Sequence, residues 1–374
     1  MKKIAIMHVV LTLDVGGLEN GVVNLINGLD HERFESHLCC LKHFGPLAKR
    51  IQSSTMTATE FGHYGGYRWG VIRRLAALMR KQRIDVVHTR NFKPYVFGFI
   101  AAKLAGVPVI VHSEHGRDYP FVPWNMWLQK QLSRRTDAVV ALSQDLKQCL
   151  VRYVGIADTK ITTIGNGVDA RRFMPGDKQA AKAALGLQGE ERIVGSVGRL
   201  APVKNYHDLI RAMAPLIDRD HRLRLVLVGD GPARQSLEAQ ARVLGIAGQV
   251  TFTGTRDDIP QLLQAMDVFA LTSRNEGMSN TLLEAMAAGL PVVASDVGGN
   301  GEIVASDIAG FLYPSGDVVR LTHIIGRLTS DTVLRDAMGM AARRHVQAHY
   351  SIDVMIDNYA RLYTDCLARQ RANG

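Results

Sequence analysis

The sequence is poor in cysteine and aromatic residues, and it has no long apolar run. Four cysteines in 374 residues, with Cys39 and Cys40 adjacent, give neither a metal-ligand spacing nor a disulfide framework, so we expect a reducing compartment. No stretch reaches the roughly eighteen apolar residues that a membrane span needs. The first residues, Met1 to Ile6, lack the apolar core of a signal peptide. Together these absences predict a cytoplasmic protein.

The sequence also lacks a dinucleotide-binding fingerprint and a metal-binding motif, which limits the reactions to be considered. Gly229-Asp230-Gly231-Pro232 follows the predicted strand 223–228, but it lacks the third glycine of a dinucleotide fingerprint and contains a proline, which argues against a dehydrogenase. Asp218-Arg219-Asp220 has the letters of the metal-binding Asp-x-Asp motif. It precedes a strand, whereas ligand sites of parallel sheets follow strands, so we interpret it as a solvated turn. We therefore expect no metal and no bound cofactor.

The remaining composition, 47% hydrophobic and 21% charged, is that of an ordinary globular protein, and the length suits two domains. Predicted strands, loops and helices alternate from residue 3 and again from residue 193, and a short strand at 161–164 leads into Asn166-Gly167 between the two series. The sequence therefore predicts an α/β protein of two doubly wound, Rossmann-like domains, residues 1–165 and 166–350. The last segment, 351–374, is predicted to be a helix that packs back on the first domain through an apolar stripe of Met355, Tyr359, Leu362 and Tyr363.

The net charge of +10 belongs entirely to the predicted first domain. Residues 1–165 hold 22 Lys and Arg against 12 Asp and Glu, and the remainder of the chain is balanced. This asymmetry favours an anionic partner, namely a membrane surface, a polyprenyl diphosphate or nucleic acid. No nucleic-acid motif or interleaved aromatic platform supports the last of these, so we expect no nucleic-acid partner.

Residues 62–83 combine aromatic and basic side chains. The predicted helix carries Arg73, Arg74, Arg80 and Lys81, and the loop before it holds Tyr64, Tyr67, Arg68 and Trp69. The segment either docks on anionic lipid or covers the sheet as a surface helix. We favour the covering helix and keep the aromatic loop as a candidate contact for an acceptor or a membrane.

Two loops of the first domain follow predicted strands, where open α/β sheets bind ligands. Gly16 and Gly17 come after the strand 3–10, where they either offer amides to a phosphate or only permit a tight turn. His115 lies in His-Ser-Glu-His-Gly-Arg-Asp, directly after the strand 107–112. We take His115 as the leading candidate here, ahead of its neighbours His112, Glu114 and Asp118.

The second domain offers a phosphate grip and a pair of carboxylates. Arg199 and Lys204, five positions apart in the loop after the strand 193–197, are suited to bind two phosphates. Glu276 and Glu284 are eight positions apart, one in a glycine-containing turn and the other two turns into a helix. The helix N-terminus between them is an anion site. A nucleotide-sugar, with hydroxyls at both ends and phosphate in the middle, fits this arrangement.

The stretch 275–297, NEGMSNTLLEAMAAGLPVVASDV, resembles the E-x(7)-E signature of retaining glycosyltransferases of family 4, which have the GT-B fold: two Rossmann-like domains that face each other across a cleft. The resemblance implies that Glu284 holds the ribose, and that Glu276 with the turn Gly277, Met278, Ser279 and Asn280 holds the donor sugar. It also implies that Arg199 and Lys204 stabilise the departing diphosphate and that Gly16 and Gly17 approach it. The turn with Gly254 and Arg256 would pack on the base, and His115 would touch a sugar hydroxyl.

The resemblance further implies a retaining, metal-independent transfer from a nucleotide-sugar, with a UDP-sugar favoured and GDP-mannose next. The first domain would bind the acceptor and the second the donor, with closure about Asn166. The phrase LDVGGLENGVVNLI resembles a subgroup tied to bacterial exopolysaccharide systems. That subgroup points to a glycan or lipid-linked sugar acceptor and to a peripheral position on the inner membrane face. The alternatives are a nucleotide-sugar-binding protein of this fold without turnover, an epimerase and a phosphorylase.

Overall fold

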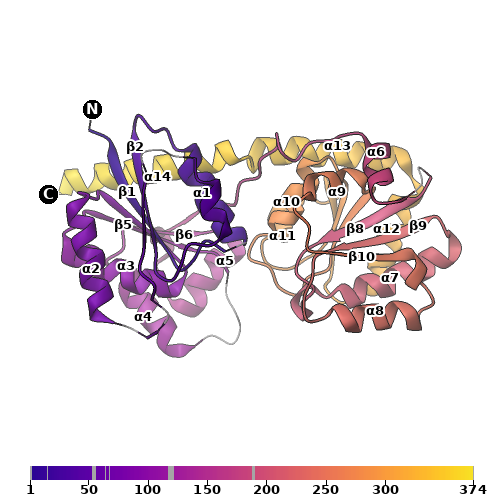
Figure 1. The fold of residues 1–374 in the computed structure, drawn as a ribbon, viewed down its shortest axis with the longest axis horizontal. Helices are drawn as coiled ribbons and strands as arrows, with labels where there is room; N and C mark the ends of the chain where they lie inside the picture. The colour runs from indigo at the N-terminus through magenta and orange to yellow at the C-terminus, as the bar shows by residue number, and fades with distance from the viewer. Residues whose placement is uncertain are drawn as a thin grey trace. The chain divides into compact units, whose positions relative to one another are not determined.

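The computed structural model describes residues 2–14, 16–52, 56–63, 65–66, 68–116, 122–187 and 190–373. The chain divides into two compact units, which are coloured along the sequence in Figure 1. The first unit comprises Met1–Asn166 together with Ile352–Gly374, and the second comprises Gly167–Ser351. These divisions lie one residue from the predicted ones at 165 and 350.

The first unit is built on a parallel sheet in which the described part of the chain contributes seven strands, in the order β3-β2-β1-β4-β5-β6-β7. The strand order reverses between β1 and β4, and open α/β sheets bind ligands at the carboxyl edge of such a reversal. The strands are β1 (Ile4–Val10), β2 (Phe34–Cys40), β3 (Thr57–Glu60), β4 (Val86–Arg90), β5 (Val109–Glu114), β6 (Ala138–Ala141) and β7 (Ile161–Thr163).

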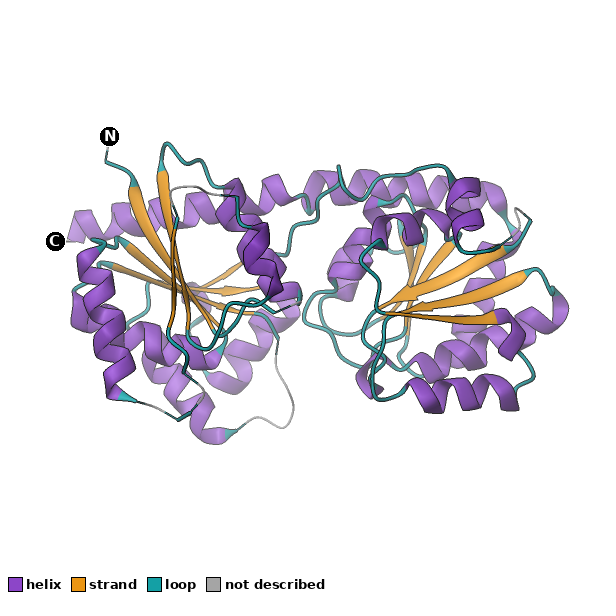
Figure 2. Ribbon diagram, in the orientation of Figure 1, coloured by secondary structure: helices purple, strands orange, loops and turns teal. Residues whose placement is uncertain are grey.

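Helices cover both faces of this sheet, as Figure 2 shows. They are α1 (Gly17–Gly28), α2 (Trp69–Lys81), α3 (Phe92–Ala105), α4 (Pro123–Ser133), α5 (Gln144–Cys149) and α14 (Ile352–Asn373). Successive strand residues point to opposite faces. Thus Met7 and Val87 pack with α2 and α3, whereas Ile6 and Val86 pack with α14. The helix α2 buries Val71, Leu75 and Met79 in this core, which confirms the covering helix predicted for residues 62–83.

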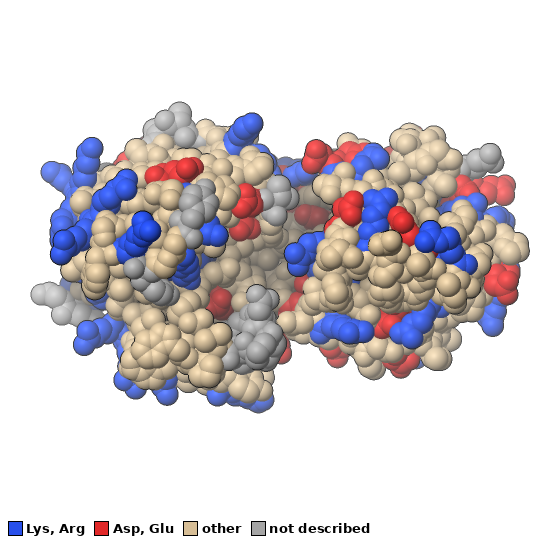
Figure 3. All heavy atoms as spheres, turned by 60° about the horizontal axis from the view of Figure 1, so that its bottom comes forward, with Lys and Arg blue, Asp and Glu red and all other residues tan. Residues whose placement is uncertain are grey.

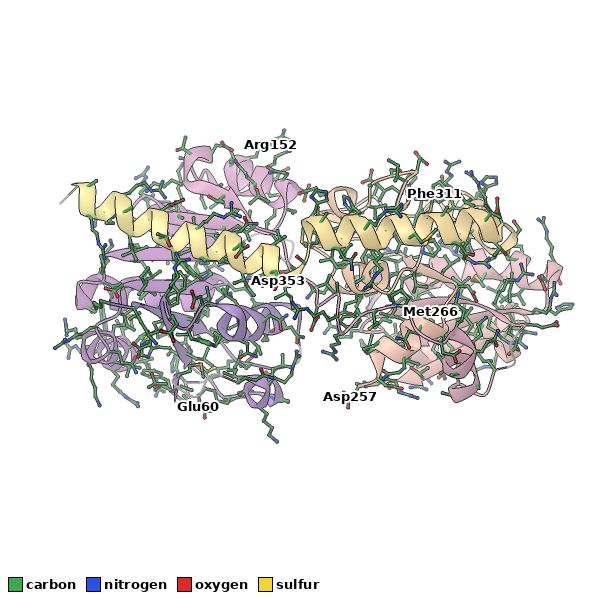
Figure 4. The ribbon with its side chains drawn as sticks, turned by 90° about the horizontal axis from the view of Figure 1, so that it is seen from above. Glu60, Arg152, Asp257, Met266, Phe311 and Asp353 are labelled. Atoms are coloured by element: carbon green, nitrogen blue, oxygen red, sulfur yellow. The ribbon has the colours of Figure 1, made fainter. Side chains whose placement is uncertain are left out.

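The C-terminal helix α14 belongs to the first unit, as predicted. Figure 4 shows it crossing the strands of this unit, with Asp353 in its first turn. Its stripe of Met355, Tyr359, Leu362 and Tyr363 is buried against β1, β4, β5 and β6. Tyr359 and Tyr363 also place two hydroxyls above the ends of β4 and β5, where His88 Nδ1 is 2.6 Å from the Tyr363 hydroxyl and Ser113 Oγ is 3.3 Å from that of Tyr359.

The second unit has a parallel sheet to which the described residues contribute six strands, in the order β10-β9-β8-β11-β12-β13. Here the order reverses between β8 and β11. The strands are β8 (Arg192–Val197), β9 (Leu223–Val228), β10 (Val250–Gly254), β11 (Val268–Leu271), β12 (Val292–Ser295) and β13 (Gly310–Tyr313). The helices are α6 (Lys178–Ala184), α7 (Tyr206–Arg219), α8 (Arg234–Val243), α9 (Ile259–Ala265), α10 (Asn280–Ala287), α11 (Asn300–Ile303), α12 (Val318–Ser330) and α13 (Thr332–His349).

Candidate active site

In the second unit, Lys204 and Glu276 meet where the strand order reverses. Lys204 ends a 3₁₀ turn in the loop after β8, and Glu276 lies in the loop after β11. Lys204 Nζ is 2.5 Å from Glu276 Oε1, and Ser273 Oγ donates to the same oxygen at 2.6 Å. The two loops are tied together by a hydrogen bond from Arg274 N to the Val203 carbonyl at 2.8 Å. The structure therefore brings together two residues that the sequence places 72 positions apart.

Gly298, in the loop after β12, holds the Glu276 turn in place. Its φ is +54°, and a Cβ at this position would lie 1.8 Å from the Glu276 carbonyl oxygen. The next residue, Gly299, donates its N–H to the Gly277 carbonyl at 3.1 Å. A side chain at residue 298 would therefore displace the backbone that carries Glu276, which gives the Gly-Gly pair after β12 a structural reason.

The helix α10 begins directly after this turn. Ser279 is its N-cap, and the Ser279 Oγ accepts from Leu282 N at 3.3 Å. The first N–H groups of a helix have no partner inside it and form the positive end of the dipole, so this end favours an anion. Glu284 lies one turn further on. Loss of hydration raises the pKa of its carboxyl to about 7, although the Arg172 guanidinium acts in the opposite direction.

Arg199 is exposed, and its side chain has no ion pair or hydrogen bond within the described ranges. Its loop packs backbone to backbone against the loop after β9: Leu200 N donates to the Asp230 carbonyl at 2.9 Å. A Cβ on Gly229 or Gly231 would lie 2.2 Å from the Gly198 oxygen or 2.5 Å from the Leu200 oxygen. These glycines, which resembled part of a dinucleotide fingerprint, thus support the loop that presents Arg199.

The two residues predicted to pack on a nucleotide base differ in their surroundings. Gly254 has a φ of +70°, and its carbonyl accepts from Gly229 N at 2.9 Å, which places it beside the loop after β9. Arg256 is exposed, and its guanidinium binds both carboxylate oxygens of Asp258, at 2.8 and 2.5 Å. In the described part of the unit, no contact joins Arg256 to Lys204 or Glu276.

In the first unit, buried polar side chains gather at the carboxyl ends of β1, β4 and β5. His88 is held by the Tyr363 hydroxyl at Nδ1 and by Ser113 Oγ at Nε2, at 2.6 and 2.7 Å. Arg90 Nη1 lies 3.3 Å from His8 Nδ1. The cluster was not identified from the sequence, although polar residues inside the strand Val-Val-His-Thr-Arg are a signal that is visible there.

His115 follows β5 at the edge of this cluster. Both of its ring nitrogens are buried and have no hydrogen-bond partner among the described residues. Loss of hydration, together with the Arg90 guanidinium and His112, holds the pKa of His115 well below its usual range. The imidazole is therefore neutral at neutral pH, and both of its nitrogens are available to a ligand.

The neighbours of His115 have packing partners on the other face of the sheet. The His112 ring stacks on Tyr95 with centroids 3.7 Å apart, and its Nδ1 is 3.0 Å from Thr89 Oγ1. Glu114 accepts from Gln129 Nε2 at 2.7 Å. These contacts make both residues part of the protein's own packing.

The glycine loop after β1 leads into α1, which begins at Gly17. The Gly16 carbonyl accepts from Asn20 N at 3.0 Å, and a Cβ on Gly16 would lie 2.3 Å from Glu19 Oε2. Glu19 lies in the first turn of the helix, as predicted, and burial raises the pKa of its carboxyl.

Other residues singled out in the sequence lie outside the described residues, namely Val15, Tyr64, Tyr67, Arg117 and Asp118.

Asp220 of the Asp-x-Asp sequence binds the guanidinium groups of Arg192 and Arg222, and Asp218 lies on α7. Asp220 is therefore ion-paired to its neighbours as well as solvated. Within the described ranges, no group of three or more His, Cys, Asp or Glu side chains is arranged to hold a metal ion. The described helices also include none that is both long and apolar enough to span a membrane.

Comparison with known proteins identifies the family. Residues 15–172 match the family described as Glycosyltransferase Family 4, and residues 177–345 match Glycosyl transferases group 1. A putative glycosyltransferase EpsF of Bacillus subtilis is 30% identical over 305 residues, which cover 78% of this chain and 79% of that protein. The chain belongs to glycosyltransferase family 4.

One further relative agrees with this assignment, and a solved structure shares the fold. This family 4 glycosyltransferase is 29% identical over 383 residues to the UDP-Gal:alpha-D-GlcNAc-diphosphoundecaprenol alpha-1,3-galactosyltransferase of Escherichia coli, with 98% of each chain covered. It also superposes on the crystal structure of Anabaena Alr3699/HepE in complex with UDP with a TM-score of 0.85 at 23% identity, covering 97% of this chain and all of that one. The predicted family, the α/β GT-B fold and the glycosyltransferase activity are confirmed.

Proposed function

We propose that this glycosyltransferase transfers a hexosyl group from a UDP-sugar, without a metal and with retention of configuration, to a lipid-linked sugar or glycan acceptor. The observation that carries the proposal is the contact between Lys204 and Glu276 at the strand-order reversal of the second unit, beside the N-terminus of α10. A cation, a carboxylate and a helix N-terminus adjoin each other there. The cation and the helix N-terminus favour a diphosphate, and the carboxylate can accept hydrogen bonds from a sugar.

In this proposal the second unit binds the donor. Arg199, Lys204 and the first amides of α10 bind the diphosphate, because all three favour negative charge. Glu276 and the turn Gly277–Asn280 bind the sugar, and Glu284 accepts hydrogen bonds from the ribose hydroxyls. Gly254 approaches the base through its backbone. The Arg256 guanidinium contacts the base only if it first breaks its ion pair with Asp258.

A UDP-sugar is favoured over GDP-mannose by two observations on related proteins. The Escherichia coli relative is named for a UDP-galactose donor, and the Anabaena structure holds UDP. The same relative is named for an acceptor sugar linked to a lipid diphosphate, which supports a lipid-linked acceptor here. A role in bacterial exopolysaccharide or cell-surface glycan synthesis rests on the resemblance of residues 13–26 to that subgroup.

The chemistry requires negative charge to be stabilised on the departing UDP. The bond from the anomeric carbon to the β-phosphate oxygen breaks while the acceptor oxygen bonds to the same face of the sugar, and the acceptor proton passes to the released phosphate. Lys204, Arg199 and the α10 amides stabilise the leaving group, so no metal is needed in this scheme. Glu276 is already bonded to Lys204 and Ser273, which fixes the position of its carboxylate. In this proposal the carboxylate lies beside the reacting carbon.

We assign acceptor binding to the first unit. His115, whose two ring nitrogens have no partner among the described residues, would bond a sugar hydroxyl, and the amides of Gly16 and Gly17 would approach a phosphate. Contact with an anionic membrane is supported by exposed tryptophans: Trp69 is 65% exposed, Trp124 64% and Trp127 51%. The last two stack with centroids 4.9 Å apart. Tryptophan prefers the membrane interface, and Figure 3 shows Lys and Arg side chains gathered where α2 lies.

The test is a donor panel. Purified protein is incubated with UDP- and GDP-sugars and a synthetic acceptor that carries a sugar on a lipid diphosphate, and the released nucleotide is measured with and without EDTA. We expect acceptor-dependent release of UDP that EDTA leaves unchanged. Release of GDP alone would overturn the donor assignment, and loss of activity with EDTA that Mg²⁺ or Mn²⁺ restores would overturn metal independence. Nucleotide binding without turnover would favour a binding protein.

A further inference from the structure

The buried cluster of the first unit contains an arginine that has no acidic partner among the described residues. Arg90 is the last residue of β4 and lies at the reversal between β1 and β4, the place where a sheet of this kind leaves a crevice. It shares a sheet face with His88, two positions before it, and His88 lies beside His8 of β1 in the strand register. The next residue, Asn91, is exposed and has a φ of +61°, a conformation rare outside glycine.

The guanidinium of Arg90 is almost fully buried, with 2% of the residue exposed. No carboxylate of the described residues lies within ion-pair distance of it, and its side chain makes one hydrogen bond, to His8. An arginine side chain has five N–H donors and keeps its charge, so burial without an anion is unfavourable. The remaining polar neighbours of Arg90 are neutral: Tyr359 and Tyr363 from α14 and His88 from β4.

Two histidines beside Arg90 also have ring nitrogens without a hydrogen-bond partner among the described residues. His8 Nε2 and both nitrogens of His115 are buried and have no hydrogen bond within the described ranges. The pKa of His8, His88 and His115 is lowered mainly by loss of hydration and, second in size, by the positive charge of Arg90. The electrostatic potential in the cluster is therefore positive. His88 differs, because both of its nitrogens are bonded to protein groups. Only the unpaired groups are candidates to contact a ligand.

We infer that Arg90, His8 and His115 form a subsite for a phosphoryl group of the acceptor, so that the protein selects acceptors whose sugar is attached to phosphate. Each of these three side chains has at least one polar atom without a hydrogen-bond partner among the described residues, which the phosphate oxygens would supply, and the buried charge would be neutralised. His115 and the next residue, Gly116, are partly exposed, so the cluster adjoins solvent at His115. This inference rests on the proposed function and adds the class of acceptor to it.

The experiment uses the full chain saturated with UDP, so that the donor site is occupied, and titrates inorganic pyrophosphate calorimetrically. The wild type is compared with Arg90→Gln, Arg90→Lys and Arg135→Gln, in which an exposed arginine of the same unit loses the same charge. We expect wild type and Arg135→Gln to bind alike, and Arg90→Gln to bind about tenfold or more weakly, because charge-assisted hydrogen bonds are lost. Arg90→Lys should retain part of the affinity.

In the transfer assay, Arg90→Gln should raise the KM for an acceptor bearing diphosphate, while the KM for an uncharged glycoside acceptor stays the same. Equal pyrophosphate affinities for Arg90→Gln and Arg135→Gln would overturn the inference. So would absence of pyrophosphate binding to the UDP-saturated wild type, a result that needs no variant to fold. A shift of UDP affinity in Arg90→Gln alone would reassign the arginine to the donor. Failure of UDP to bind the wild type would instead contradict the proposed function.

Discussion

The raised pKa of Glu284 makes the stability of the protein depend on pH in a way that one substitution removes. Burial raises the pKa of this carboxyl from an ordinary value of 4.5 to about 7 in the folded protein. The unfolded chain therefore releases this proton at lower pH than the folded chain does. The protonated carboxyl of Glu284 therefore stabilises the folded state below pH 4.5, and this stabilisation is lost as the pH rises from 4.5 to about 7.

The size of the effect follows from the pKa values. Each pKa unit corresponds to about 1.4 kcal/mol, so complete loss between 4.5 and about 7 destabilises the fold by at most about 3.5 kcal/mol above pH 7. Because the side chain is partly exposed, we expect about 1–3 kcal/mol. Glu284→Gln keeps the shape of the neutral acid and does not ionise. Its free energy of unfolding should lie closest to that of the wild type at pH 5 and exceed it by this amount at pH 8.

UDP binding should couple to the same proton. Ribose hydroxyls donate to the ionised carboxylate, so bound UDP lowers the pKa of Glu284, and wild-type protein releases a proton on binding between about pH 5 and 7. Glu284→Gln should bind UDP about tenfold or more weakly at pH 8, because a hydrogen bond to a charged group contributes about 1.5–3 kcal/mol.

The assays are denaturant unfolding at pH 5, 6, 7 and 8, and calorimetric UDP titration in two buffers of different ionisation enthalpy. Protons that UDP itself releases or takes up are the same in both titrations, so they cancel when wild type and Glu284→Gln are compared. A stability difference that stays constant from pH 5 to 8, or equal proton release by both proteins, would refute the reasoning.

Three further predictions follow from other contacts. Gly298→Ala should abolish transfer and destabilise the fold by about 1–3 kcal/mol, since its Cβ would lie 1.8 Å from the Glu276 carbonyl oxygen at a φ of +54°; activity and denaturant unfolding measure both effects. Arg199→Ala should weaken UDP binding about tenfold in calorimetry while the Tm is unchanged, because the exposed side chain has no bond to the described residues that would be lost. Trp124→Ser with Trp127→Ser should reduce sedimentation with anionic vesicles but leave UDP affinity unchanged, because the pair lies on the first unit.

Each of these predictions has a control or a contrary result. Gly248→Ala is the control for Gly298→Ala, because a Cβ at residue 248 would meet nothing within 4 Å. Equal loss of activity in both variants would contradict the role of Gly298. A lowered Tm in Arg199→Ala would mean that this arginine supports the fold. Unchanged vesicle binding by the tryptophan variant would remove α4 from the membrane contact.

The parts of the molecule that local patterns encode were predictable. The alternation of strands and helices gave the α/β class, and the apolar stripe of α14 gave its return to the first unit. The turn and helix from Glu276 to Glu284 form one contiguous stretch, so their spacing alone placed both acids about one helix end.

Other contacts arise from strand register and loop packing, which no local pattern specifies. Ser273 meets Glu276 because a loop turns back on itself, and Gly298 supports that turn from the end of another strand. Arg90 meets His8, which lies 82 residues earlier in the sequence, because β4 pairs with β1. Arg256 was predicted from the resemblance, and the structure adds a bond to Asp258 that its sequence neighbourhood did not reveal.

The most direct test of retaining transfer from a UDP-sugar at the Lys204–Glu276 site is the stereochemistry of the first product. Proton NMR during the reaction of an α-linked UDP-sugar should show an α-linked product from the earliest time points. Lys204→Met should lower kcat about 100-fold or more without inverting the product, because a group that stabilises the leaving charge is lost. A β-linked first product, or an unchanged kcat in a correctly folded Lys204→Met protein, would contradict the account.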